Sequence, residues 1–384
     1  MIAMVAPTRS DGIRVLGLDL EAAAEAAFAA GVARGRAREQ YTALFREGRP
    51  APWMRLPSMP VVREEAEGVT VKFAQRLEPS PLDPPSVRDH GDGLETESVI
   101  LPQQSAGGRP RVSLCVSSQV GCAMGCTFCE TARMGRMRQL SVEEIVAQWF
   151  AARHQFGTRI DNIVFMGMGE PMDNLDAVLP AIEVLVGHHG PAVAPSRITV
   201  STVGKADGIR RYAEFASRRG FRRLNLAVSL NAPTDEIRDE LMPINRAVPM
   251  DELFAAMRDW VERVAARILI EYVLIPGVND ALEHADLLVA RLGDLPATVN
   301  VIPYNPRRDS PWPAPDEATV IAFTERVAAG GRLVKRRRTM GRSLMGACGQ
   351  LGNPAIRSRR FVALGGTAAG ESGVESAAGP PEEG

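Results

Sequence analysis

The chain has 384 residues, of which 45% are hydrophobic and 24% are charged, and its formal net charge is −1. These values are typical of a soluble globular protein with one large α/β domain and an appendage. The near-neutral charge excludes a generally polycationic protein, and no apolar run approaches the ~18 residues of a membrane span. The chain start lacks the basic-then-apolar pattern of a signal peptide, so we expect a cytoplasmic protein.

The chain ends differ in composition from the middle. Residues 1–90 form a separate accessory region, in which 21–48 is rich in helix formers and predicts a small helical subdomain that could contact RNA. Pro, Gly and Asp crowd 77–93, which predicts a linker or exposed turn. The tail at 362–384 has small and acidic residues without periodicity, which predicts disorder. Residues 95–352 form the core.

Within the core, short apolar runs of β-forming residues alternate with helical patterns. Strands are expected at 111–118, 162–167, 197–202, 224–230, 268–275 and 299–304. Helices are expected at 141–155, 174–187, 205–219, 250–266, 280–293 and 315–329. Consecutive βα units of this kind predict a parallel sheet with helices outside it. A closed eight-unit barrel would need two more strands, so we predict a six-stranded partial barrel.

Three cysteines follow the first predicted strand in the spacing Cys-x3-Cys-x2-Cys, at Cys122, Cys126 and Cys129. The carboxyl ends of parallel strands are where such sheets place their chemistry. Three thiolates on one short loop can hold a [4Fe–4S] cluster and leave one iron open. A zinc or redox loop is the alternative, but the paired ligand spacing of zinc sites is absent. The total of five cysteines is odd and does not suit a secreted disulfide framework.

Several further motifs accompany the cysteine loop in a fixed order. The segments "LCVSSQVGCAMGCTFC", "MGMGEPMDN", "VSLNAPTDEIRDELMPIN" and "ACGQL" resemble the RlmN/Cfr family of radical S-adenosylmethionine (SAM) ribosomal RNA adenine methyltransferases. The resemblance covers roughly residues 95–352. It implies a radical SAM partial (β/α)6 barrel and a [4Fe–4S] cluster on Cys122, Cys126 and Cys129, whose open iron binds SAM. The cluster would then deliver an electron that splits SAM to a radical.

The resemblance also implies a set of SAM contacts at or just after the predicted strand ends. These residues are Gly169, Glu170, Ser201, Ser229, Leu230, Asn231 and Asn305. Each alone would more often be an ordinary hydrogen-bonding residue at a strand end or turn. Many relatives have histidine at position 231, but asparagine can also donate and accept hydrogen bonds.

The two remaining cysteines, Cys115 and Cys348, would carry the reaction. A lone cysteine is most often a small buried apolar residue. The resemblance instead implies that Cys348 takes a methyl group from one SAM, and that a second SAM yields the radical that activates this methyl. The carbon then adds to adenine, and Cys115 attacks the Cys348 sulfur, which releases the product and leaves a disulfide to be reduced. Two SAM molecules would be used per turnover.

The family's proton acceptor during product release aligns with Glu97, and Glu95 is a second candidate. A surface carboxylate at the start of a strand is the competing interpretation of Glu97. Relatives have an acidic and small-residue pattern before the last cysteine, where this chain has Arg342, Ser343 and Met345.

The predicted function is methylation of adenine C2 in 23S ribosomal RNA, with transfer RNA as a second candidate substrate. A C8 methyltransferase like Cfr, a divergent paralogue with another substrate, and a non-catalytic RNA-binding protein with a structural cluster stay open as alternatives. The basic run from Arg332 to Arg342 would contact phosphates. The expected partners are RNA and an electron donor such as flavodoxin or ferredoxin, and the expected state is a monomer.

Overall fold

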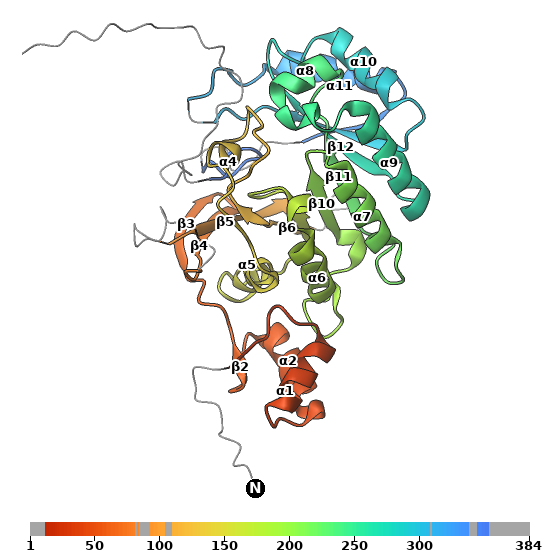
Figure 1. Ribbon diagram of the computed structural model, residues 1–384. Coiled ribbons are helices and arrows are strands. Elements are labelled where there is room, and N and C mark those ends of the chain that lie inside the picture. Colours follow the sequence, from red (N-terminus) through yellow and green to blue (C-terminus); the bar gives the residue numbers. More distant parts are fainter. Residues whose placement is uncertain are drawn as a thin grey trace, which may run out of the picture.

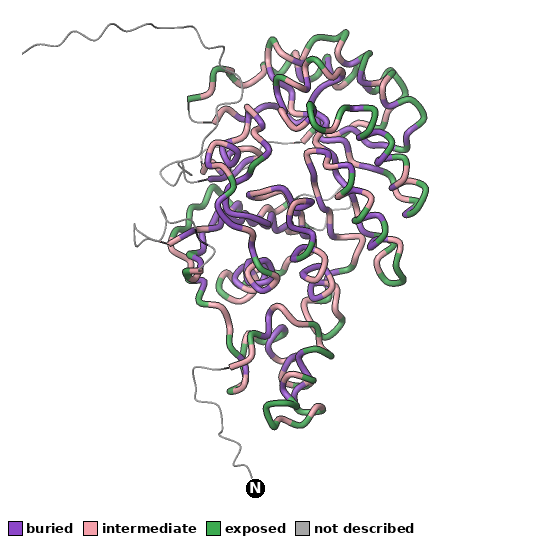
Figure 2. The backbone as a smooth tube through the Cα atoms, viewed as in Figure 1, coloured by how far each residue is buried: buried purple, intermediate pink, exposed green. Residues whose placement is uncertain are grey.

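The computed structural model describes residues 12–80, 83, 93–103, 110–307, 309–337 and 344–352. Its centre is a ten-stranded sheet with the order β14-β13-β12-β11-β10-β9-β6-β5-β4-β3 (Figure 1). The strands at the middle of this sheet are mostly buried (Figure 2). No helix within the described ranges is long and apolar enough to cross a membrane.

Seven neighbouring strands of the sheet run parallel. They are β6 (Arg111–Cys115), β9 (Asn162–Phe165), β10 (Ile198–Thr202), β11 (Asn225–Ser229), β12 (Ile268–Leu274), β13 (Ala297–Pro303) and β14 (Leu333–Arg336). The first six are those predicted from the apolar runs, so the partial-barrel prediction is confirmed. The seventh, β14, was not predicted because its sequence LVKR is short, basic and mostly exposed.

The helices that connect these strands also agree with the sequence. They are α5 (Val142–His154), α6 (Leu175–Val186), α7 (Ala206–Ser217), α9 (Met250–Val264), α10 (Leu282–Leu292) and α11 (Glu317–Ala329). Helices α6, α7 and α9 lie in a row along one side of the sheet (Figure 1). Tyr212 of α7 stacks on Trp260 of α9 with ring centroids 5.0 Å apart, and both side chains are fully buried. This packing places the helices outside the parallel strands.

Three antiparallel strands extend the sheet beyond β6: β5 (Glu95–Gln103), β4 (Thr70–Arg76) and β3 (Val61–Glu67). The domain division expected at residue 90 therefore falls inside one sheet, because β3 pairs with β4 and β4 pairs with β5. β3 could not be predicted from its charged sequence, VVREEAE, because an exposed edge strand needs no apolar alternation.

The helical subdomain expected at 21–48 is a pair of helices, α1 (Leu20–Ala29) and α2 (Arg34–Glu47). Asp19 caps α1 by accepting a hydrogen bond from Ala22 N at 2.8 Å. Phe45 of α2 packs near Trp149 of α5, with ring centroids 6.1 Å apart, which fixes this helical pair against the core. In Figure 1 the pair lies below α5 and α6.

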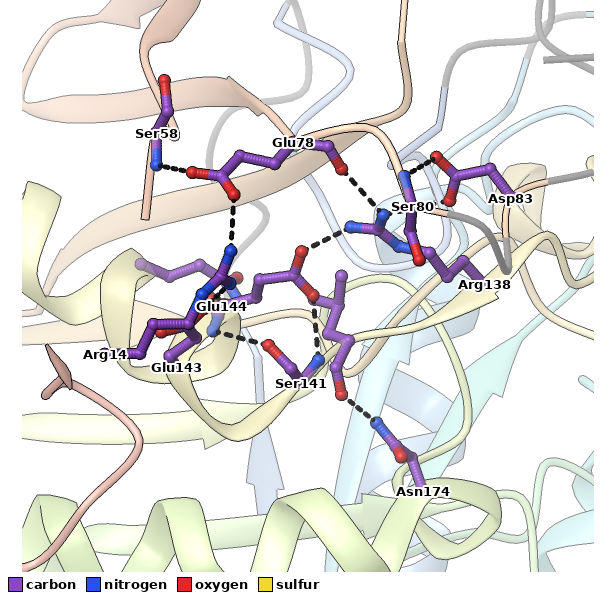
Figure 3. Close-up of polar contacts among 12 residues, drawn as sticks. Arg14, Ser58, Glu78, Ser80, Asp83, Arg138, Ser141, Glu143, Glu144 and Asn174 are labelled. Carbon is purple, nitrogen blue, oxygen red and sulfur yellow. Dashed lines mark hydrogen bonds and ion pairs between the residues drawn. The ribbon is translucent and has the colours of Figure 1, made fainter. Parts of the chain in front are cut away.

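The stretch 77–93 was expected to be a linker or exposed turn. Its described residues include Leu77 and Asp83, which are 2% and 4% exposed. Asp83 pairs with Arg138 at 3.0 Å (Figure 3), so this part of the chain is fastened to the core. The tail at 362–384 lies outside the described residues.

Candidate active site

A cavity of about 140 Å³ opens at the carboxyl ends of the parallel strands. Its wall includes Glu170 after β9, Ser201 near the end of β10, and Ser229 at the end of β11. Cys126 and Cys348, which lie far apart in the sequence, both line this cavity. The cavity therefore brings the two predicted halves of the site together.

The cysteine loop runs from the short strand β7 (Gln119–Val120) to the helix α4 (Glu130–Arg133). Gly121 begins it with φ +73°, and a Cβ there would lie 1.8 Å from Gly135 O, so only glycine fits. β7 pairs with β8 (Arg138–Gln139), which closes the loop from the other end.

The end of β8 is anchored by a buried ionic network around Arg138 (Figure 3). The guanidinium donates to Asp83 and to Glu78 O, each at 3.0 Å, and also to Glu144. Glu144 in turn completes a capping box with Ser141 at the start of α5. This network holds the strand pair that frames the cysteine loop.

The thiols of Cys122, Cys126 and Cys129 lie near one another. Burial is the main cause that raises the pKa of each, and the neighbouring Cys126 and Cys129 add to the rise at Cys122. Cys126 and Cys129 also line the cavity. Buried thiols with raised pKa values become thiolates only beside positive charge, which a bound metal centre supplies.

Glu170 is oriented by backbone donors on both carboxylate oxygens. Met172 N donates to it at 3.0 Å and Val203 N at 2.9 Å. Burial, the largest influence, raises the pKa of Glu170 to about 7, and the hydrogen bonds partly oppose this rise. The preceding Gly169 has φ +99°, and a Cβ there would lie 2.5 Å from Gln119 Cβ, so glycine is required for this turn.

The other predicted cofactor contacts divide into two groups. Ser201, Ser229 and Asn231 line the cavity, and Asn231 Oδ1 accepts a hydrogen bond from Val273 N at 2.9 Å. Leu230 and Asn305 are 0% and 4% exposed, and neither is part of the cavity wall.

Cys115 and Cys348 come from segments that are far apart in the sequence. Cys115 ends β6 and is 6% exposed, and burial raises its pKa to about 12. The Cys348 thiol is the next largest influence on that rise. Both cysteines are free, as are the other three, and the structure contains no disulfide between described residues. The expectation of a disulfide is therefore not met in this state.

Glu97 is only 2% exposed, so the surface alternative for this residue is wrong. Its carboxylate accepts a hydrogen bond from Gly352 N at 2.8 Å and pairs with Lys72 at 3.3 Å. Glu95 instead pairs with Arg63 at 2.7 Å and Arg76 at 3.4 Å, both of which are partly exposed. Neither glutamate lines the cavity, but Glu97 touches the segment that carries Cys348.

The sequence analysis missed two charged residues of the cavity wall, Glu271 and Arg337. Their charged groups lie 3.8 Å apart, and Asn300 donates to Glu271 at 2.8 Å. The electrostatic influence of Cys348 is the largest cause that raises the pKa of Arg337. Burial opposes this rise, and Glu271 and Cys115 add to it. The signal for Glu271 was a single acid within the apolar strand ILIEYVL. Arg337 was expected to contact phosphate. In the structure it lies in the cavity wall together with Cys348.

The rest of the predicted phosphate-binding run is only partly described. Arg332 donates to backbone carbonyls, among them Val289 O at 3.3 Å, and Arg336 pairs with Glu317. Both side chains are therefore engaged within the protein. Residues 338–343 lie outside the described residues.

Comparisons with known proteins agree with this geometry. The radical SAM superfamily profile matches residues 116–288. A probable dual-specificity RNA methyltransferase RlmN 1 of Protochlamydia amoebophila is 43% identical over 269 residues, which are 70% of this chain and 73% of that protein. A dual-specificity RNA methyltransferase RlmN of Syntrophobacter fumaroxidans is 44% identical over 262 residues, 68% of this chain and 73% of its own. The chain belongs to the RlmN family of radical SAM RNA methyltransferases.

A solved structure supports the same assignment to the RlmN family at the level of the fold. The crystal structure of a radical SAM methyltransferase from Sphaerobacter thermophilus superposes with a TM-score of 0.78 and 35% identity. The match covers 88% of this chain and 98% of that one. The antiparallel strands and the N-terminal helices thus belong to an architecture that this methyltransferase shares over almost its whole length.

Membership of the radical SAM superfamily implies a [4Fe–4S] cluster and SAM. The donor set of this RlmN-family chain fits both groups, because two of the loop thiols and the Glu170 carboxylate line one cavity. As they stand, no three His, Cys, Asp or Glu side chains in the described ranges are arranged to hold a metal ion.

Proposed function

We propose that this RlmN-family protein methylates C2 of an adenine in 23S ribosomal RNA through a methyl group carried on Cys348. The observation that carries the proposal is the position of Cys348. It lines the same cavity as Cys126, Cys129 and Glu170, and it interacts electrostatically with Cys115, whose pKa it raises. A structural cluster would need neither of these two further thiols.

The cavity residues would divide the binding of the two cofactors. Cys122, Cys126 and Cys129 would hold the [4Fe–4S] cluster. Glu170 would accept a hydrogen bond from the amino group of SAM, and the turn at Gly169 would let the backbone approach it. When bound, the cluster supplies an electron that splits SAM to a carbon radical. Ser201, Ser229, Asn231, Leu230 and Asn305 complete the proposed SAM site.

The two reaction thiols differ in their surroundings in a way that suits different roles. Cys115 is buried with a pKa of about 12, so it stays protonated at neutral pH and does not compete for the first methyl group. Cys348 is half-buried at the cavity wall beside Arg337, where a methyl donor can reach it. After the Cys348 methyl carbon has bonded to adenine, Cys115 attacks the Cys348 sulfur. A bond forms between the two sulfurs as the bond from the Cys348 sulfur to the carbon breaks. That carbon takes up one proton, which balances the one lost from the Cys115 thiol, and this completes the methyl group of the released base.

Glu97 remains the candidate proton acceptor for product release. It is bonded to Gly352, four residues from Cys348, which supports a role near the reacting base. The substrate adenine must leave its stack to enter a cavity of this size, as in other enzymes that modify bases.

The relatives that are dual-specificity RNA methyltransferases support a second RNA class, which we propose to be transfer RNA. We further propose that the protein works in the cytoplasm as a monomer, with flavodoxin or ferredoxin as its electron donor.

The test is nucleoside mass spectrometry after anaerobic incubation of the reconstituted protein with SAM, a reductant and unmodified ribosomal RNA. The proposal predicts 2-methyladenosine with the wild type and none with Cys348→Ala. A yield of 8-methyladenosine would move the protein to the C8 class. Cleavage of SAM without any methylated adenosine would mean that RNA adenine is not the substrate.

A further inference from the structure

The segment 344–352, which carries Cys348, contains no helix or strand and is held by contacts to distant residues. On its N-terminal side, Lys72 Nζ donates to Leu344 O at 3.4 Å and to Met345 O at 3.3 Å. On its C-terminal side, Gly352 N donates to Glu97 Oε2 at 2.8 Å. These contacts enclose Cys348 between them. Since an irregular segment has no ladder of its own, they decide where Cys348 lies.

Lys72 and Glu97 form a buried ion pair on the neighbouring strands β4 and β5. Their charged atoms are 3.3 Å apart, and the side chains are 8% and 2% exposed. A buried pair is stable only when further hydrogen bonds satisfy its remaining donors and acceptors. Here the Cys348 segment supplies two carbonyls for the ammonium and one N–H for the carboxylate, while the partly exposed Arg63 approaches the other carboxylate oxygen at 3.5 Å. The pair and the segment therefore depend on each other.

The backbone at Met345 gives an independent reason for this contact. Met345 has φ +50°, which is the left-handed region that a residue with a long side chain rarely adopts. Such a conformation persists only when its surroundings hold it in place. The carbonyl of Met345 is one of the two that Lys72 binds. Lys72 thus holds the segment at its most strained described position.

The opposite edge of the segment is fastened to the cysteine loop. Glu130 N donates to Gly349 O at 2.7 Å, and Thr131 Oγ1 donates to Leu351 O at 2.5 Å. Glu130 directly follows Cys129 in the chain. The segment therefore bridges the Lys72–Glu97 pair and the loop that would bear the cluster.

We propose that Lys72 and Glu97 form a latch that sets the position of the Cys348 sulfur in the cavity. The inference rests on the proposed function, in which Cys348 carries the methyl group. Lys72 and Glu97 act here as positioning residues, because they act on Cys348 through the backbone of the segment 344–352. Substituting Lys72 separates this role from proton transfer, which only Glu97 could perform.

The test compares Lys72→Met and Lys72→Gln with Lys72→Arg, and with Arg76→Met as a matched control on the same strand. Arg76 is partly exposed, and its ion-pair partner among the described residues is Glu95. In reconstituted holoenzyme, hydrogen exchange of 344–352 and the alkylation rate of Cys348 by iodoacetamide are measured by peptide-resolved mass spectrometry. Loss of the two carbonyl contacts should speed both at least about tenfold, because hydrogen bonds from a charged donor resist local opening of the segment. Turnover should fall, while the Kd for SAM stays at the wild-type value.

Lys72→Arg should restore slow alkylation, because it keeps the charge and its donors. The proposal is overturned if Lys72→Met and Lys72→Gln leave exchange and alkylation of the segment unchanged. It is also overturned if exchange rises equally across the whole protein, which would mean that the pair serves general stability. Neither readout needs RNA or methylation, so they stand even if adenine proves not to be the substrate.

Discussion

Replacing Arg138 should destabilise the protein more than any exposed ion pair does, because Arg138 joins two carboxylates inside the structure (Figure 3). The side chains of Arg138, Asp83 and Glu144 are 6%, 3% and 12% exposed. Breaking a buried ion pair by removing one partner costs about 3–5 kcal/mol. After Arg138→Met, Asp83 still accepts from Ser80 N at 2.8 Å and Glu144 from Ser141 N at 2.9 Å. We therefore expect the lower end of that range, about 3 kcal/mol.

The assay is urea unfolding of Arg138→Met beside wild type, with Arg76→Met as the control. The control should lose no more than about 1 kcal/mol, because its pair is partly exposed. A triple variant with Asp83→Asn and Glu144→Gln should recover part of the loss, since it removes the unpaired charges. The iron content after reconstitution should also fall in Arg138→Met, because β8 frames the cysteine loop. A loss of free energy of unfolding below about 1 kcal/mol in Arg138→Met would refute the reasoning.

Four further substitutions test the site. Cys348→Ala should abolish RNA methylation and leave RNA binding, measured by filter binding, unchanged. Cys115→Ala should trap a covalent protein–RNA adduct on denaturing gels; free RNA alone would contradict the role of this thiol. Gly169→Ala should cost about 2 kcal/mol of stability and weaken SAM binding in equilibrium dialysis, because φ +99° and the contact with Gln119 exclude a Cβ. Arg337→Gln should lower single-turnover methylation at least about tenfold, and an unchanged rate would remove Arg337 from the reaction.

The sequence predicted the parallel strands because each is a short apolar run buried between helices, as Ile268–Leu274 illustrates. It missed β14 and β3, since edge strands need few apolar residues and theirs are largely charged. It also missed β4 and β5, which lie inside the sheet but carry polar and charged residues among their apolar ones.

The part of the site that lies at the strand ends could be predicted from the sequence. The resemblance to the RlmN/Cfr family named Glu170, Ser201 and Ser229, which fall at or after strand ends, and the structure brings them to one cavity. Lys72 could not be found this way, because its contacts are with Leu344 and Met345, more than 270 residues away. A lysine on a strand looks like a solvated side chain until its tertiary partners are known.

The central claim is that the carbon added to adenine passes through the methyl group of Cys348. The most direct test supplies SAM with a trideuterated methyl group and counts the deuterium atoms in the 2-methyladenosine formed. The Cys348 methyl group must lose one hydrogen before it bonds to adenine, so the account predicts a product methyl that carries two deuterium atoms. A product with three would mean that the methyl group was transferred intact, which would contradict the account.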